Sequence, residues 1–179
     1  LIFKNLDKNV KDYEIILIDD GSDDKTWTEI VKISNKFENI VSIKLLENYG
    51  KSDALDAGFK VCKGNYVLTM DADLQDDPSE ILPLYSMIIE NKYDLVSGWK
   101  KKRNDPLTKT IPSKFFNLVT RLFSGIKLND FNCGIKIYRK EVINSINLYG
   151  EMHRYIPLIA KWNGFNLSLI HISEPTRQV

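Results

Sequence analysis

The segment YVLTMDADLQDDPSE (66–80) runs from an apolar stretch through five acidic residues into the start of a helix. Its first residues are aromatic, β-branched or aliphatic, which is typical of a buried strand. At its end, Asp77 precedes a proline and Glu80 follows three positions later, which predicts a capped helix start. The segment therefore predicts a strand, an acidic loop and a helix, and it leaves Asp71 and Asp73 without a structural role.

The rest of the chain repeats this alternation of strand and helix. Short apolar runs predict the strands, and apolar residues at helical spacing predict the helices. The predicted strands are 13–19, 41–47, 66–72 and 94–99, and the predicted helices are 26–37, 51–62 and 78–92. Because buried strands joined by helices favour a parallel sheet, we expect an α/β fold with a mostly parallel sheet and helices on both faces.

Composition limits the class of protein. At 179 residues, with 43% hydrophobic and 27% charged residues, the chain is expected to form one soluble domain with a core. A net charge of +1 argues against a nucleic-acid partner. Cys62 and Cys133 lack metal-ligand spacing and are expected to be reduced, which fits a cytosolic setting. The sequence contains no signal peptide, and no apolar run approaches the ~18 residues of a membrane span.

Polar residues follow each of the four predicted strands. In an open parallel sheet, ligands bind beyond the carboxyl ends of the strands. The residues expected at that edge are Asp19–Asp20, Asn48–Ser52, Asp71–Asp73 and Ser97–Lys100. The sequence therefore predicts a ligand site there.

Asp71 and Asp73 lie two positions apart after a strand, so both side chains can point the same way. Two carboxylates about 5 Å apart repel each other by roughly 3 kcal/mol at an effective dielectric constant of about 20. A divalent cation relieves that repulsion, and these carboxylates with the Gln75 amide oxygen suit Mg²⁺ or Mn²⁺. Two solvated turn acids are the alternative interpretation, and Asp76 is expected to be solvated.

Four segments together resemble consecutive motifs of the family-2 inverting glycosyltransferases with the GT-A fold, in the branch that acts on polyprenyl and dolichyl phosphates. The segments are YEIILIDDGSDDKT (13–26), ENYGKSDALDAGFKVCKGNYVLTMDADLQDDPSEI (47–81), DLVSGWKKKRNDP (94–106) and LNDFNCGIKIYRKEV (128–142). The resemblance implies a Rossmann-like sheet and metal-dependent transfer of a sugar from a UDP- or GDP-sugar to a lipid phosphate.

The resemblance also implies roles for individual residues. Asp71, Asp73 and Gln75 are implied to hold the metal ion, and Asp20 matches the acid that contacts the nucleobase. The residues implied to bind the nucleotide-sugar are Asp19, Asp20, Ser22, Gly50, Lys51, Asp53, Asp71, Ala72 and Asp73.

Five further residues match catalytic or acceptor positions of the family. Lys100 and Arg103 match basic residues that meet phosphates, although arginine is more usual at the first position. Asp130 matches an acid that orients or deprotonates the acceptor. His153 and Arg154 match a segment on the acceptor side, and a surface pair is the alternative interpretation.

The stretch 108–128 is amphipathic, with aromatic and aliphatic residues on one side and basic residues on the other. It predicts either a core-facing helix or a helix that lies on an anionic membrane surface. With a lipid acceptor, the second interpretation implies a protein at the cytoplasmic face of a membrane, peripheral or anchored by segments outside this sequence.

The chain departs from the family pattern at both ends. The family's first strand precedes residue 1, so the expected catalytic domain, 1–168, lacks an internal strand and leaves an apolar sheet edge unpaired. Residues 169–179 do not resemble the family and are interpreted as an atypical tail, consistent with foreign sequence.

Two other functions stay open at this point. A related transferase could act on a glycan hydroxyl, and a non-catalytic module could bind a nucleotide-sugar. A nicotinamide dehydrogenase or a P-loop kinase is disfavoured, because the first strand ends in Asp-Asp-Gly-Ser and not in a glycine-rich phosphate loop.

Overall fold

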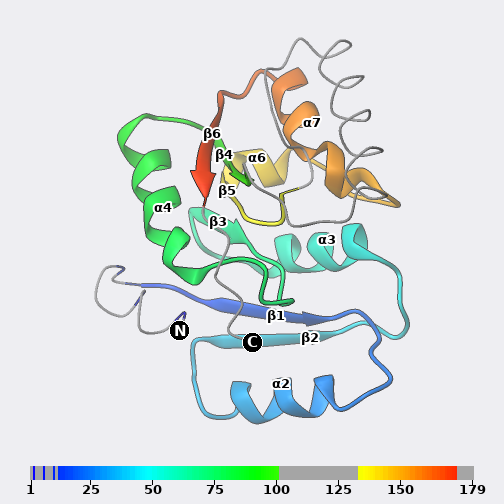
Figure 1. The fold of residues 1–179 in the computed structure, drawn as a ribbon. Helices are drawn as coiled ribbons and strands as arrows, with labels where there is room; N and C mark the ends of the chain where they lie inside the picture. The colour runs from blue at the N-terminus through cyan, green and yellow to red at the C-terminus, as the bar shows by residue number, and fades with distance from the viewer. Residues whose placement is uncertain (1, 3–5, 7–9, 11, 101–132, 173–179) are drawn as a thin grey trace.

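The computed structural model describes residues 2, 6, 10, 12–100 and 133–172 (Figure 1). Its strands are β1 (Ile15–Asp19), β2 (Ile40–Lys44), β3 (Tyr66–Thr69), β4 (Leu95–Lys100), β5 (Lys136–Arg139) and β6 (Leu167–Ile172). Its α-helices are α2 (Thr26–Ser34), α3 (Lys51–Val61), α4 (Ile81–Glu90), α6 (Lys140–Asn144) and α7 (Ile156–Trp162). Two 3₁₀ turns, η1 (Pro78–Glu80) and η2 (Met152–Tyr155), precede α4 and α7.

The predicted alternation up to residue 100 is confirmed, with element ends that differ by a few residues. The strands form a parallel β1–β2 pair and a four-stranded sheet in the order β3-β5-β4-β6. Within the second sheet β4 and β6 are parallel, whereas β5 runs antiparallel to both β3 and β4. The fold is therefore α/β with parallel strands, as expected, and β5 adds antiparallel pairings that the sequence pattern did not predict.

The helix start after β3 forms as predicted. The Asp77 carboxylate accepts a hydrogen bond from the Ser79 backbone N–H at 2.9 Å, which satisfies one of the free N–H groups of the first turn. Pro78 occupies the first position, where its missing N–H costs nothing. The acidic loop is thus held between the end of β3 and a fixed helix start.

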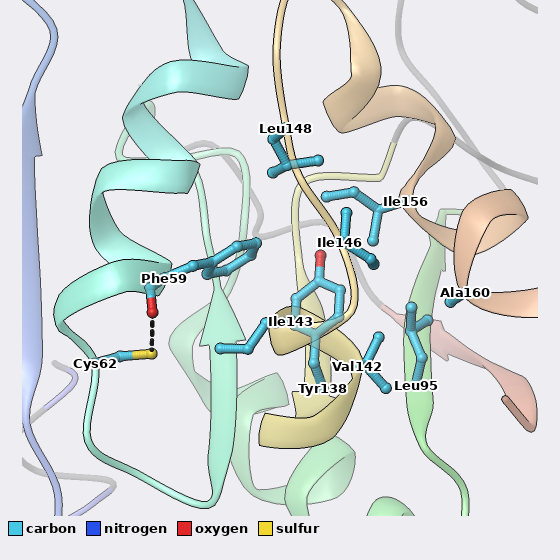
Figure 2. Close-up of a cluster of buried hydrophobic side chains, with 10 residues drawn as sticks. All are labelled: Phe59, Cys62, Leu95, Tyr138, Val142, Ile143, Ile146, Leu148, Ile156 and Ala160. Atoms are coloured by element: carbon cyan, nitrogen blue, oxygen red, sulfur yellow. Dashed lines mark hydrogen bonds between the residues drawn. The ribbon is translucent and has the colours of Figure 1, made fainter. Parts of the chain in front are cut away.

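Two hydrophobic clusters cover opposite faces of the β4–β5 pair. Leu95 and Tyr138 pack on one face with residues of α3, α6 and α7 (Figure 2). Their neighbours Val96 and Ile137 pack on the other face with Leu84 and Ile88 of α4. Because successive side chains of a strand point to opposite faces, this alternation buries both faces, and the expected helices on both sides are confirmed.

The unpaired sheet edge expected from the sequence stays a prediction. Among the described residues, β1 pairs only with β2 and β3 pairs only with β5. At the other end of the sheet, β6 pairs with β4 from Leu95 to Lys100, so residues 169–172 of the expected tail belong to a strand. Within the described ranges no helix is both long and apolar enough to cross a membrane.

Two neighbouring isoleucines of α4 test this packing. Ile88 is fully buried and Ile89 is 40% exposed. We expect Ile88→Ala to lower the free energy of unfolding of the full-length protein by about 2–5 kcal/mol, because it leaves a cavity. The same change at Ile89 is expected to cost about 1 kcal/mol or less. Urea unfolding followed by circular dichroism measures both, and equal losses would contradict the assigned face of α4.

Candidate functional site

The acidic loop after β3 lies directly against Gly134. A Cβ atom at this position would lie 2.5 Å from Asp71 Oδ2 and 2.9 Å from Asp76 Oδ2, so only glycine leaves room for the two carboxylates. Because β5 runs antiparallel to β3, the residues before β5 lie at the edge where β3 ends. The Thr69 hydroxyl donates to the Gly134 carbonyl at 3.2 Å and fixes this approach.

Gly134 is a site residue that the sequence analysis did not select. Its only sequence signal is its place in the motif 128–142. The prediction for Asp76 was wrong: Asp76 is 7% exposed, and its Oδ2 accepts a hydrogen bond from the Asp71 N–H at 3.4 Å. Asp76 is buried because the loop folds back under Asp71 and against Gly134.

Lys51 is the cation that faces Asp71. Its Nζ lies 2.6 Å from Asp71 Oδ1 and 2.7 Å from Oδ2, and each side chain is 39% exposed. Lys51 is the first residue of α3, so the ion pair joins the start of this helix to the end of β3. The structure therefore brings together two residues that the sequence analysis expected at one edge.

The remaining expected metal ligands lie beside Asp71 on an exposed turn. Asp73 Oδ1 accepts a hydrogen bond from the Gln75 N–H at 3.0 Å, and Leu74 between them adopts a positive φ of 63°. Ala72 is exposed on the same turn. In the part of the chain that the structure describes, no three His, Cys, Asp or Glu side chains form a ready metal cluster.

A divalent cation fits these residues in two respects. The donors are hard oxygens, which Mg²⁺ and Mn²⁺ prefer, and Gly134 lets the Asp71 carboxylate take its position at the end of β3. Such ions usually bind one or two protein carboxylates and complete their shell with substrate phosphates and water. Asp71 and Asp73 with Gln75 would be the protein's share of the ligands.

The two acids after β1 differ in their partners. Asp20 accepts hydrogen bonds from the N–H groups of Tyr49 and Gly50, both at 2.9 Å, so both of its oxygens hold the loop before α3. Asp19 is 2% exposed, and its Oδ1 accepts from the Ser22 N–H at 3.2 Å. Asp19 Oδ2 is buried without a hydrogen-bond partner among the described residues, which is costly unless a ligand supplies a donor.

Two glycines shape the loops at this edge. Gly21 has a φ of 70°, and a Cβ there would clash with the backbone of Glu47, so this turn requires glycine. Gly50 has a φ of 95° and precedes α3, and nothing lies within 4 Å of where its Cβ would be. Asp53 occupies the first turn of the same helix.

His153 is connected to this edge through Ser52. The fully buried Ser52 hydroxyl accepts a hydrogen bond from the His153 backbone N–H at 3.0 Å and lies 3.0 Å from its Nδ1. Burial lowers the pKa of the His153 imidazole below its ordinary value of 6.5, and the charge of Lys51 lowers it further. Arg154 instead pairs with Glu151 at 3.0 Å on the surface, and the acceptor-side role of both residues stays a prediction.

Three expected catalytic residues have no described side chain. Lys100 ends β4, and only its backbone is described. Arg103, Asp130 and the amphipathic stretch 108–128 lie outside the described residues, so their roles stay predictions.

The chain matches known proteins along most of its length. The family model described as glycosyl transferase family 2 matches residues 2–146. The chain is 39% identical over 147 residues to the dodecaprenyl-phosphate galacturonate synthase of Rhizobium johnstonii, which covers 81% of this chain and 44% of the relative. It is 34% identical over 149 residues to the undecaprenyl-phosphate 4-deoxy-4-formamido-L-arabinose transferase of Pseudomonas syringae, covering 83% and 44%. The chain thus spans less than half the length of these relatives.

The fold also matches solved structures. The glucosyl-3-phosphoglycerate synthase of Mycobacterium tuberculosis, in complex with Mn²⁺, UDP-glucose and phosphoglyceric acid, superposes with a TM-score of 0.67 at 19% identity. The match covers 98% of this chain and 66% of that one. At this identity the likeness establishes the shared fold.

Replacement of Gly134 tests the approach of β5 to the acidic loop. In Gly134→Ala the new Cβ displaces the Asp71 carboxylate, and we expect Mn²⁺ affinity in the presence of UDP or GDP to fall roughly 10- to 100-fold. Titration calorimetry of the full-length protein measures the change. Gly64→Ala, whose Cβ would lie 3.2 Å from the Tyr66 carbonyl oxygen at the other end of β3, is the control. Equal Mn²⁺ affinities of Gly134→Ala and the parent protein would contradict the role of Gly134 in placing the Asp71 carboxylate.

The buried contact of His153 predicts a pH-dependent contribution to stability. Because its folded pKa lies below the ordinary 6.5, the contribution is present above about pH 6.5 and is lost as the pH falls through the folded pKa. The charged groups that act on this pKa are Lys51, Arg154 and Lys136, which lower it, and Glu151, which raises it. We expect the Tm difference between the parent protein and His153→Gln to shrink as the pH falls from 7.5 to about 5.5. A pH-independent difference would contradict this account.

Proposed function

The chain belongs to glycosyl transferase family 2, and from this membership and its site we propose that the full-length protein transfers a sugar from a nucleotide-sugar to a polyprenyl phosphate. Both relatives described above are named for a dodecaprenyl or undecaprenyl phosphate, which supports a lipid phosphate as the acceptor. The donor side is supported by the structural neighbour that holds UDP-glucose with Mn²⁺.

The observation that carries the proposal is the Asp71 carboxylate, which lies on Gly134 and faces Lys51 at the end of β3. A divalent cation bound there would supply positive charge that offsets the negative charge growing on the leaving nucleoside diphosphate. The Asp71 carboxylate would hold that cation, and the neighbouring Lys51 ammonium group would add a second positive charge for the diphosphate.

The acids after β1 suit the nucleotide end of the donor. Asp20 fixes the loop of Tyr49 and Gly50, so it shapes the pocket through the backbone. Asp19 has a buried oxygen without a partner among the described residues, and an N–H group of a nucleobase would satisfy it. The resemblance gives the base contact to Asp20, so we propose that Asp20 contacts the base and shapes the loop, with Asp19 beside it in the same pocket.

The acceptor determines how much base catalysis is needed. A lipid phosphate is anionic at neutral pH and attacks the anomeric carbon in line without losing a proton, whereas a sugar hydroxyl needs a base. With a phosphate acceptor, Asp130 positions the acceptor. Because a polyprenyl chain is apolar and resides in a bilayer, the reaction takes place at a membrane surface, which we assign to its cytoplasmic face.

A transfer assay with the full-length protein tests the proposal. Radiolabelled UDP- and GDP-sugars are incubated with polyprenyl phosphate, with and without Mn²⁺, and we expect label in the extracted lipid only with the metal ion. Label in a glycan and none in the lipid would favour the transferase that acts on hydroxyl groups. Metal-dependent nucleotide binding without transfer to either acceptor would favour the non-catalytic module.

In the same assay, Asp71→Asn and Asp73→Asn are expected to lower the transfer rate by at least about 100-fold, because each removes a carboxylate that would hold the metal ion stabilising the leaving diphosphate. Asp56→Asn is the matched control, since Asp56 pairs with Lys60 on the outer side of α3. An undiminished transfer rate in either Asp71→Asn or Asp73→Asn would contradict the metal-dependent mechanism.

A further inference from the structure

Lys51 contacts Asp71 in the way a bound cation would. Its ammonium group lies 2.6 and 2.7 Å from the two carboxylate oxygens, so it engages both at once. A Mg²⁺ or Mn²⁺ ion held by Asp71 would need at least one of these same carboxylate oxygens as its ligand. The ammonium and the metal ion therefore compete for the same carboxylate.

We propose that Lys51 is an internal cation that closes the metal site of the donor-free protein, and that it transfers to the donor's diphosphate when the metal ion takes its place on Asp71. This inference rests on the proposed function, because it takes Asp71 as a metal ligand. It adds a prediction about binding: the metal ion and the diphosphate bind cooperatively, and each binds weakly without the other.

The exchange requires only a rotation of the Lys51 side chain, because the backbone around it is held. The next residue, Ser52, is fully buried and bound to His153 by its backbone N–H and its ring. The preceding residue, Gly50, donates its N–H to Asp20. The Lys51 side chain itself is 39% exposed, and the space over Gly50 is open.

Charge explains why the exchange depends on the diphosphate. Lys51 and Asp71 neutralise each other, so a divalent cation that displaces Lys51 leaves an ammonium group beside a second positive charge. A diphosphate removes this cost because it binds the metal ion and also gives Lys51 a new anionic partner. Since such coupling is reciprocal, the diphosphate must raise metal affinity by the factor by which the metal ion raises diphosphate affinity.

A lysine–aspartate pair within α3, Lys60 with Asp56, provides an internal comparison. Lys60 Nζ lies 2.5 Å from Asp56 Oδ2, with the same residue types at a similar distance. This pair connects residues four apart on one helix, and neither residue is a partner of Asp71 in its ion pair with Lys51. Removal of Lys60 therefore changes the charge of the helix by the same amount without opening Asp71.

The test measures Mn²⁺ binding by the full-length protein through the electron paramagnetic resonance signal of free Mn²⁺. It is performed without nucleotide, with UDP and with GDP. In Lys51→Met we expect Mn²⁺ alone to bind tighter by a factor on the order of ten, within the usual range of coupling between two ligands. The added effect of the nucleotide is expected to shrink by the same factor. Lys60→Met is expected to match the parent protein.

Two further variants separate the possible failures. Lys51→Arg keeps a cation that can engage both carboxylate oxygens, so it is expected to exclude Mn²⁺ as the parent protein does. If Lys51→Met binds Mn²⁺ alone no better than the parent, the exchange is wrong. If Asp71→Asn binds Mn²⁺ as well as the parent, the proposed metal site itself is wrong.

Discussion

The contact between Asp71 and Gly134 is the constraint on which the site depends. It requires β5 to enter the sheet antiparallel to β3, because only then do the residues before β5 reach the edge where β3 ends. It also requires a glycine, since any Cβ would occupy the position of the carboxylate. Thr69 of β3 pairs with Lys136 of β5, which lies 67 positions later in the sequence. This long-range pairing thus fixes the position of the Asp71 carboxylate.

The same contact explains why the loop after β3 is partly buried although it contains four aspartates. Asp76 lies beneath Asp71 and accepts its N–H, Asp73 turns the chain by accepting from Gln75, and Asp77 caps the next turn. Each of these carboxylates accepts a backbone N–H in the described structure, so most of the loop's acids shape it. Asp71 also contacts the half-exposed Lys51 ammonium group through both of its carboxylate oxygens.

The sequence predicted local features well and long-range contacts poorly, for physical reasons. The strands and helices up to residue 100 follow from apolar periodicity, and the Asp77 cap follows from residues three apart. β5 was missed because it has only four residues, Lys136 to Arg139, with a charged residue at each end and no alternation of apolar and polar side chains. Gly134 was missed because a close approach between distant segments leaves no local signal, and the wrong expectation for Asp76 has the same origin.

Adjacent acids are distinguished by what they bond to, which a sequence cannot express. Asp19 and Asp20 are identical in chemistry and follow the same strand, yet alternation along the strand sends one inward and the other towards the loop before α3. The inward acid, Asp19, has one oxygen without a hydrogen-bond donor among the described residues. Both oxygens of the outward acid, Asp20, accept hydrogen bonds from the Tyr49–Gly50 backbone, which leads directly into Lys51. Asp20 therefore acts on the site indirectly, because it fixes the backbone from which Lys51 reaches Asp71. Asp20 after β1 and Asp71 after β3 are in this way connected through one short loop, in which the backbone held by Asp20 leads directly into Lys51.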